Sequence, residues 1–321
     1  TNSILTNRYT HGPAMTTLFL TDSSHAAHAM QGHPERPRRV QRIVEAIEDT
    51  GVIGDVKALP VVPASLDDLA RVHDRAYVDE ICSFEPDNKT YMIGGDTYLA
   101  PGSLPAARLA AGAAVQATLQ VLAGAATNAF CAVRPPGHHA EAGAAMGFCF
   151  FNSVAIAAAT ALEREGIHRV AILDIDVHHC NGTVDIFKDD PRVLVCSSFQ
   201  DNFYPGRYLD FENDHVLNTP LKAGQDGKGF RHSISNRWWR RMEDFAPDLI
   251  LLSAGFDAHL EDTISQLEFT DSDYAWFIRE LLAVAETLTG GRLISVLEGG
   301  YSEEVLARVV PDHLVTLAGK G

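Results

Sequence analysis

Val170-Ala-Ile-Leu-Asp-Ile-Asp-Val-His-His179 is the stretch that decides the fold, because it begins as an apolar run and ends in carboxylate and imidazole side chains. A short, continuously apolar run with β-branched residues is typical of a parallel strand that is buried on both faces. The chain holds four more runs of this kind, at Ala129–Val133, Val193–Cys196, Leu249–Leu252 and Leu293–Leu297. We therefore expect these runs to form a mostly parallel sheet at the centre of the protein.

Segments with helical patterns alternate with the apolar runs. They are Arg38–Asp49, Pro105–Ala123, Asn152–Arg164, Gly229–Phe245 and Asp271–Thr289. Alternation of strands and helices is typical of βαβ units, in which helices cover the faces of a parallel sheet. The predicted fold class is therefore α/β, with a single domain built on a central, mostly parallel sheet flanked by helices.

The composition fits one large domain. The chain has 321 residues, of which 46% are hydrophobic, and no flexible linker divides it. We expect residues 1–16 to form an irregular N-terminal extension and residues 17–321 to form the domain. The formal net charge of -16 disfavours nucleic acid as a partner. Five scattered cysteines favour reduced thiols and a cytoplasmic location, and no segment predicts a membrane span.

Reactive side chains follow four of the predicted strands. The four stretches are Arg134-Pro-Pro-Gly-His-His139, Asp174-Ile-Asp-Val-His178, Ser253-Ala-Gly-Phe-Asp257 and Glu298-Gly-Gly-Tyr301. In an open α/β sheet, ligands bind beyond the carboxyl ends of the strands. We therefore expect these stretches to meet at one rim of the sheet.

Two aspartates and a histidine at this rim predict a metal site. Asp176 and His178 alternate along an extended segment and therefore face the same way, and Asp257 arrives from another strand. Two carboxylates and one imidazole leave room for a water molecule on a divalent ion. Mixed oxygen and nitrogen ligation suits zinc, with iron(II) or cobalt as alternatives.

Two histidines and a tyrosine complete the predicted chemistry. At neutral pH, the imidazole of His138 or His139 can take a proton from water and return it to a leaving amine. Asp174 and Asn181 are the candidate partners that fix the tautomer of such a base. Tyr301 follows two glycines and can donate its hydroxyl to a developing oxyanion.

Seven stretches, in this order, resemble the histone deacetylase family, which includes bacterial deacetylase-like amidohydrolases and acetylpolyamine amidohydrolases. They are Gly32-His-Pro-Glu-Arg-Pro37, Arg134-Pro-Pro-Gly-His-His139, Gly147-Phe-Cys-Phe-Phe-Asn152, Leu173-Asp-Ile-Asp-Val-His-His179, Asn181-Gly-Thr183, Ala254-Gly-Phe-Asp257 and Leu297-Glu-Gly-Gly-Tyr301. Asn181 and the Glu-Gly-Gly-Tyr form are similar to class II members of the family. The resemblance implies the arginase/deacetylase fold and removal of acetyl or similar small acyl groups from lysine side chains or related amines by metal-activated water.

The resemblance also implies a role for each residue. The metal, zinc in most members, would be held by Asp176, His178 and Asp257. His139 would act as the general base and then acid with Asn181 orienting it, His138 would lie against Asp174, and Tyr301 would polarise the acyl carbonyl. The other implied residues are a substrate tunnel of Gly147, Phe148, Tyr204 and Ile264, a product-release channel at Arg36, and structural potassium near Asp174, Phe187 and Ser197.

The chain departs from the family pattern at three informative positions. Cys180 stands where the family usually has glycine, so a thiol beside the metal ligands either makes the site sensitive to oxidants or packs as a small hydrophobic residue. Tyr204 replaces a tunnel phenylalanine and makes one wall more polar. Asp262-Thr-Ile264 replaces the usual Asp-Pro-Leu. None of these changes removes a predicted ligand or catalytic group.

Three other functions remain open from the sequence. One is acetylpolyamine hydrolysis, although the region between Cys82 and Pro105 is short for that subgroup. A second is a non-catalytic module that binds a metal or an acylated amine, and a third is an arginase-like hydrolase with two metal ions. The sequence determines neither the acyl length nor the oligomeric state.

Overall fold

The apolar runs form one sheet of eight parallel strands in the order β2-β1-β5-β10-β9-β6-β7-β8. The structure is a computed structural model that describes residues 16–84, 87 and 89–320. The strands are β1 (Thr17–Leu20), β2 (Lys57–Leu59), β5 (Asn128–Cys131), β6 (Val170–Asp174), β7 (Val193–Gln200), β8 (Val216–Leu221), β9 (Leu249–Ala254) and β10 (Leu293–Leu297). Of the predicted N-terminal extension, residues 1–15 lie outside the described residues.

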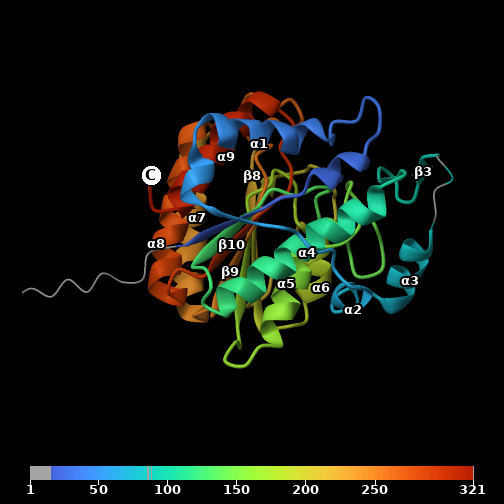
Figure 1. Cartoon of the computed structure of the whole chain (residues 1–321). Helices are drawn as coiled ribbons and strands as arrows, with labels where there is room; N and C mark the ends of the chain where they lie inside the picture. Colours follow the sequence, from blue (N-terminus) through green and yellow to red (C-terminus); the bar gives the residue numbers. More distant parts are fainter. Residues whose placement is uncertain (1–15, 85–86, 88, 321) are drawn as a thin grey trace, which may run out of the picture.

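Helices cover both faces of the sheet (Figure 1). One face packs against α1 (Arg38–Asp49), α7 (Gly227–Phe245), α8 (Asp271–Thr289) and α9 (Glu303–Leu317). The other face packs against α4 (Ser103–Leu122), α5 (Ser153–Leu162) and α6 (Asn181–Phe187). Short elements lie outside these layers, namely α2 (Leu66–Leu69), α3 (Arg75–Ser83) and the antiparallel pair β3 (Tyr91–Met92) and β4 (Tyr98–Leu99). The predicted α/β class with a single flanked parallel sheet is confirmed.

The five predicted strands and five predicted helices are all present, and some further elements were not predicted. Strand β8 lies at one edge of the sheet and contains Pro220, which lacks the N–H group that an interior strand needs. Strand β2 has three residues, two of them exposed, so it carries little apolar signal. Helix α9 contains Pro311, which disguises its helical pattern.

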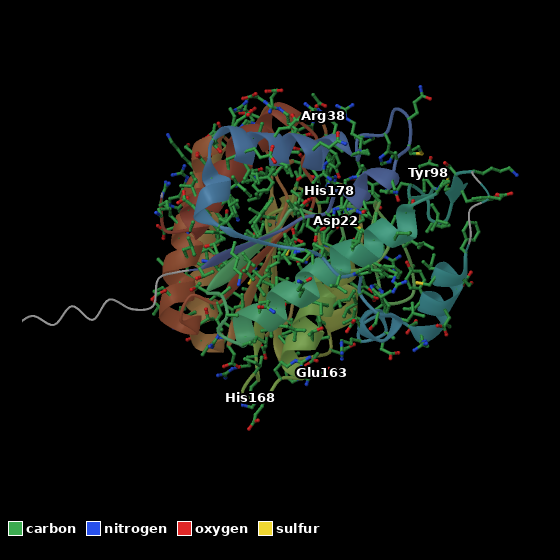
Figure 2. All side chains as sticks on the ribbon, viewed as in Figure 1. Asp22, Arg38, Tyr98, Glu163, His168 and His178 are labelled. Carbon is green, nitrogen blue, oxygen red and sulfur yellow. The ribbon has the colours of Figure 1, made fainter. Side chains whose placement is uncertain are left out.

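All eight strands of the large sheet are parallel, so their carboxyl ends lie along one edge of that sheet. Figure 2 shows the direction of β6: His168, which precedes the strand, lies at the lower edge of the molecule, and His178, which follows it, lies near the centre. The segments that follow β5, β6, β9 and β10 therefore meet in the interior rather than at the surface. Within the described ranges, no helix combines the length and apolarity that crossing a membrane requires.

Candidate active site

Asp176, His178 and Asp257 meet beyond the ends of β6 and β9, which are neighbours in the sheet. Ligand atoms of the three side chains lie within 4.8 Å of one another, and all three side chains are buried. The Nδ1 atom of His178 lies 2.9 Å from Asp176 Oδ1 and 3.4 Å from Asp257 Oδ2. The structure thus brings together the three residues that the sequence predicts as metal ligands.

Several features of this group fit a cation. Asp257 Oδ2 is buried and has no hydrogen-bond partner among the described residues. Burial, reinforced by the nearby Asp176 carboxylate, raises the pKa of Asp257 to about 6. Two glycines make room for the carboxylates, because a Cβ atom at Gly299 would lie 2.1 Å from Asp257 Oδ2 and one at Gly255 would lie 2.3 Å from Asp176 Oδ2. Carboxylates held this close together and shielded from water are stabilised by nearby positive charge, so this group could hold a cation in addition to its contact with His178.

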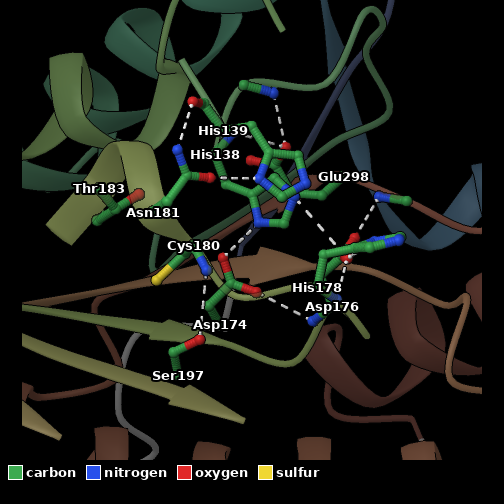
Figure 3. Close-up of polar contacts among 12 residues, drawn as sticks. His138, His139, Asp174, Asp176, His178, Cys180, Asn181, Thr183, Ser197 and Glu298 are labelled. Atoms are coloured by element: carbon green, nitrogen blue, oxygen red, sulfur yellow. Dashed lines mark hydrogen bonds and ion pairs between the residues drawn. The ribbon is translucent and has the colours of Figure 1, made fainter. Parts of the chain in front are cut away.

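His138 and His139 lie beside this group with their ring centroids 4.0 Å apart (Figure 3). The Nδ1 atom of His138 is 2.9 Å from Asp174 Oδ2, and the Nδ1 atom of His139 is 2.6 Å from Asn181 Oδ1. The rings of His139 and His178 meet edge to face at 5.6 Å. Each histidine therefore has one partner, a carboxylate for His138 and an amide for His139, as the family resemblance implies.

The pKa values of the two imidazoles are shifted in opposite directions. Burial works against a charged His138, but the carboxylates of Asp174 and Asp176 outweigh it and raise the pKa of His138 well above its ordinary value. Burial and the neighbouring His138 lower the pKa of His139 well below its ordinary value. These opposite shifts favour the charged form of His138 and the neutral form of His139.

Glu298 is a buried carboxylate for which the sequence predicts no role. Its Oε2 atom accepts hydrogen bonds from the backbone N–H groups of Gly137, at 2.6 Å, and His138, at 3.1 Å. This contact joins the end of β10 to the turn that carries both histidines. Its position in the sequence could have indicated a role, because Glu298 directly follows a buried strand, and a buried carboxylate needs hydrogen-bond partners.

Tyr301 is held by its backbone and by its ring. Asp262 Oδ2 accepts hydrogen bonds from the N–H groups of Tyr301, at 2.5 Å, and Ser302, at 3.0 Å. The guanidinium of Arg39 lies 4.9 Å from the centre of the Tyr301 ring and donates from Nε to the carbonyl of Gly300. Burial raises the pKa of Tyr301 well above its ordinary value, so its hydroxyl keeps its proton and can donate it in a hydrogen bond.

Arg36 lies near the start of α9, and its predicted role at a release channel stays a prediction. Its side chain is half-exposed and pairs with Glu303 at the start of α9. Arg39 is the buried arginine behind Tyr301. The helical repeat could have identified it, since Arg39, Ile43 and Ile47 occur four residues apart on the buried face of α1.

Three of the four predicted tunnel residues lie against His139 or Tyr301, the predicted catalytic side chains. Gly147 packs directly on the His139 ring, because a Cβ atom there would lie 2.2 Å from His139 Cδ2. The ring of Tyr204 lies edge to face against His139 at 5.2 Å, and Phe148 faces Tyr301 at 6.3 Å. Ile264 packs at the margin of the core, and its N–H donates to Asp262.

The predicted potassium ligands fall into two places. Asp174 and Ser197 are paired residues of β6 and β7. Phe187 ends α6, where its carbonyl accepts hydrogen bonds from Asp190 N and from the His215 ring. Potassium at either place stays a prediction.

Cys180 is fully buried in the apolar cluster that includes residues of α5 and α6. Burial raises the pKa of its thiol well above the ordinary value, which favours packing as a small hydrophobic residue over reactivity.

Comparison with known proteins identifies the family. The family model described as "Histone deacetylase domain" matches residues 33–317. The chain belongs to the histone deacetylase family. It is 36% identical to the histone deacetylase-like amidohydrolase of Pseudomonas aeruginosa, over 86% of this chain and 74% of that protein. It is 35% identical to the human polyamine deacetylase HDAC10, over 89% of this chain and 44% of that protein.

A solved structure agrees with this assignment. The crystal structure of the HDA15 HD domain superposes with a TM-score of 0.90 at 31% identity, and the match covers 96% of this chain and 90% of the other. The family resemblance that the sequence motifs indicate is therefore confirmed, and the chain is a hydrolase of the histone deacetylase family.

Proposed function

We propose that this protein is a zinc-dependent deacylase that hydrolyses acetyl or similar small acyl amides of lysine side chains or related amines. The observation that carries the proposal is the buried group of Asp176, His178 and Asp257, in which one carboxylate oxygen has no hydrogen-bond partner among the described residues. It lies beside two histidines that are hydrogen-bonded to Asp174 and Asn181. Its membership of the histone deacetylase family supports the same reaction class.

The residues present fit a zinc ion. Asp176, His178 and Asp257 would hold it through two carboxylates and one imidazole, the ligand types found in catalytic sites that keep a position open. Bound there, zinc would polarise the acyl carbonyl and lower the pKa of water. Zinc would also neutralise the repulsion between the two carboxylates.

His139 is the proposed general base. Its Nδ1–H donates to Asn181 Oδ1, so the lone pair is on Nε2. The lowered pKa favours the neutral ring, whose Nε2 lone pair would take a proton from the attacking water and return it to the amine nitrogen as the amide bond breaks. His138 keeps its proton on the ring beside Asp174 and supplies positive charge next to the reacting groups.

Tyr301 is the proposed oxyanion donor. Its backbone is anchored by Asp262 and its ring lies against Arg39, so we expect the hydroxyl to be preorganised before the reaction begins. A fixed donor of this kind favours the developing negative charge on the acyl oxygen over the neutral carbonyl.

Gly147, Phe148, Tyr204 and Ile264 are proposed to line the approach of the substrate chain. Apolar walls would hold a methylene chain such as that of lysine, with burial contributing roughly 0.8 kcal/mol per CH₂ group. Phe148 and Tyr204 are suitably placed, since each ring faces a catalytic side chain.

A substrate panel on the zinc-loaded protein tests the proposal. We expect hydrolysis of acetyl-lysine peptides or of short acyl-lysines, abolished by a chelator and restored by zinc. Hydrolysis of acetylpolyamines alone would replace lysine with polyamine as the substrate, an alternative favoured by the 35% identity to a polyamine deacetylase. A zinc-loaded protein that hydrolyses none of these amides would be a binding module, and two ions per chain would indicate arginase-like chemistry.

A further inference from the structure

The partner of His139 is an amide, and an amide has two different ends. Asn181 Oδ1 accepts a hydrogen bond, whereas Asn181 Nδ2 can only donate one. With Oδ1 toward the ring, the His139 proton is on Nδ1 and the lone pair is on Nε2. If the amide turned round, Nδ2 would donate to Nδ1, the ring proton would move to Nε2, and the proposed base could not accept a proton.

Glu141 prevents this reversal by its position and its chemistry. Its side chain is buried, and its Oε1 atom accepts a hydrogen bond of 2.8 Å from Asn181 Nδ2. A carboxylate is an acceptor only. In the reversed amide, Asn181 Oδ1 would face this carboxylate with no hydrogen between two oxygen atoms. Figure 3 shows the Asn181 amide beside the His139 ring, with its nitrogen turned away.

Arg207 and His73 hold Glu141 in place. Arg207 Nε lies 3.0 Å from the same Oε1 atom, and its guanidinium is half-exposed. The ring of His73 donates from Nδ1 to the Glu141 carbonyl at 2.9 Å, because its Nε2 already accepts a hydrogen bond from the backbone of Asn152. A chain of contacts therefore runs from Arg207, three residues after Tyr204 in the sequence, through Glu141 to Asn181.

We propose that Glu141 is a positioning residue that sets the direction of the Asn181 amide and thereby the tautomer of His139. This inference rests on the proposed function, in which His139 is the base. Asn181 Nδ2 also donates to the His139 carbonyl, at the longer distance of 3.2 Å. Loss of Glu141 therefore weakens the preferred direction without abolishing it, and we expect kcat to fall about tenfold.

Glu141→Leu is the first test, because leucine keeps similar bulk and removes the acceptor. We expect lower kcat with KM and zinc content nearly unchanged, since no ligand or wall residue is altered. Nitrogen NMR of the zinc-loaded, ¹⁵N-histidine-labelled protein should show that the Nδ1–H form of His139 no longer dominates. Glu163→Leu is the matched control, because Glu163 also pairs with an arginine, Arg71, but on the surface.

A second substitution makes the test specific. A carboxylate at position 181 can accept from His139 whichever way it turns, so it does not need Glu141. In the Glu141→Leu background, Asn181→Asp should restore most of the lost kcat and the Nδ1–H signal. With Glu141 present, the same substitution places two carboxylates about 3 Å apart and should lower kcat.

The outcomes separate the inference from the proposed function. Unchanged kcat and an unchanged His139 tautomer in Glu141→Leu would overturn the inference, as would equal effects of Asn181→Asp in both backgrounds. If the unmodified protein hydrolyses no acyl amide, the proposed function fails, but the NMR comparison still decides whether Glu141 sets the tautomer.

Discussion

Two clusters of buried charge lie on opposite sides of the Glu298–Tyr301 segment. The front cluster is Asp176, His178 and Asp257, and the Gly299 N–H donates a hydrogen bond to Asp176. The rear cluster is Glu35, Arg39 and Arg134, and its Arg39 donates hydrogen bonds to the carbonyls of Glu298 and Gly300. One short turn therefore separates an acidic cluster from a basic one.

The two clusters differ in how completely they are satisfied. Behind the turn, Glu35 accepts hydrogen bonds from Arg39 at 3.2 Å and from Arg134 at 2.8 and 2.6 Å. In front, Asp257 Oδ2 and Glu298 Oε1 are buried without hydrogen-bond partners in the described part of the chain. The rear cluster is complete in itself, as expected of a scaffold, whereas the front cluster has unpartnered oxygen atoms and is where we propose that zinc binds and hydrolysis occurs.

The largest expected effect is the loss of the front cluster's ion. Asp176→Ala removes one of three ligands, so we expect zinc to be lost on dialysis and hydrolysis to fall to background. Mass spectrometry measures the zinc content, and an acetyl-lysine assay measures the rate of hydrolysis. Asp244→Ala on the exposed face of α7 is the control, and a full zinc content in Asp176→Ala would show that the ligand set is wrong.

Disruption of the rear cluster should reduce stability. Glu35→Ala leaves two buried guanidinium groups without their carboxylate, which costs about 3–5 kcal/mol of the free energy of unfolding. Urea denaturation measures the change. Glu45→Ala removes an exposed carboxylate that pairs with Arg38 and should change stability little. A loss for Glu35→Ala no greater than for Glu45→Ala would contradict the scaffold role.

Tyr301 lies between the two clusters, and loss of its hydroxyl should lower the catalytic rate without changing zinc binding or stability. Tyr301→Phe removes the oxyanion donor but keeps the ring over Arg39, so we expect kcat to fall about 10²–10³-fold with zinc content and unfolding midpoint retained. Tyr91→Phe, which removes an exposed hydroxyl bonded to Asp87, is the control. An unchanged rate on an acetyl-lysine amide would remove Tyr301 from the mechanism.

The smallest expected effect concerns the wall above the front cluster. The Tyr204 hydroxyl is buried near Asp96, and it has no well-formed hydrogen bond to any residue that the structure describes. Tyr204→Phe removes this polar group, so the ratio of kcat/KM for longer apolar acyl groups to that for acetyl should rise by less than about tenfold. A fall in the ratio would show that the hydroxyl does not disfavour apolar acyl groups.

The sequence predicts the front cluster well because its residues follow buried strands. Apolar runs locate strands, parallel strands bring their ends together, and Asp176, His178 and Asp257 then converge without further information. The edge strand β8, with Pro220, lacked that signal.

The rear cluster and the supporting acids were harder to predict, because their partners are distant in sequence. Glu35 meets Arg134, and Asp262 meets Tyr301, across separate elements whose relative placement no local pattern determines. Arg36 precedes α1, whereas Arg39 lies in its first turn, where the helical phase places it on the buried face.

Titration of the metal-free protein with zinc tests the central claim most directly. If Asp176, His178 and Asp257 hold one catalytic ion, hydrolysis of an acetyl-lysine amide should rise linearly and stop rising at one zinc ion per chain. A break at two ions per chain, or full hydrolysis before any zinc is added, would contradict the account.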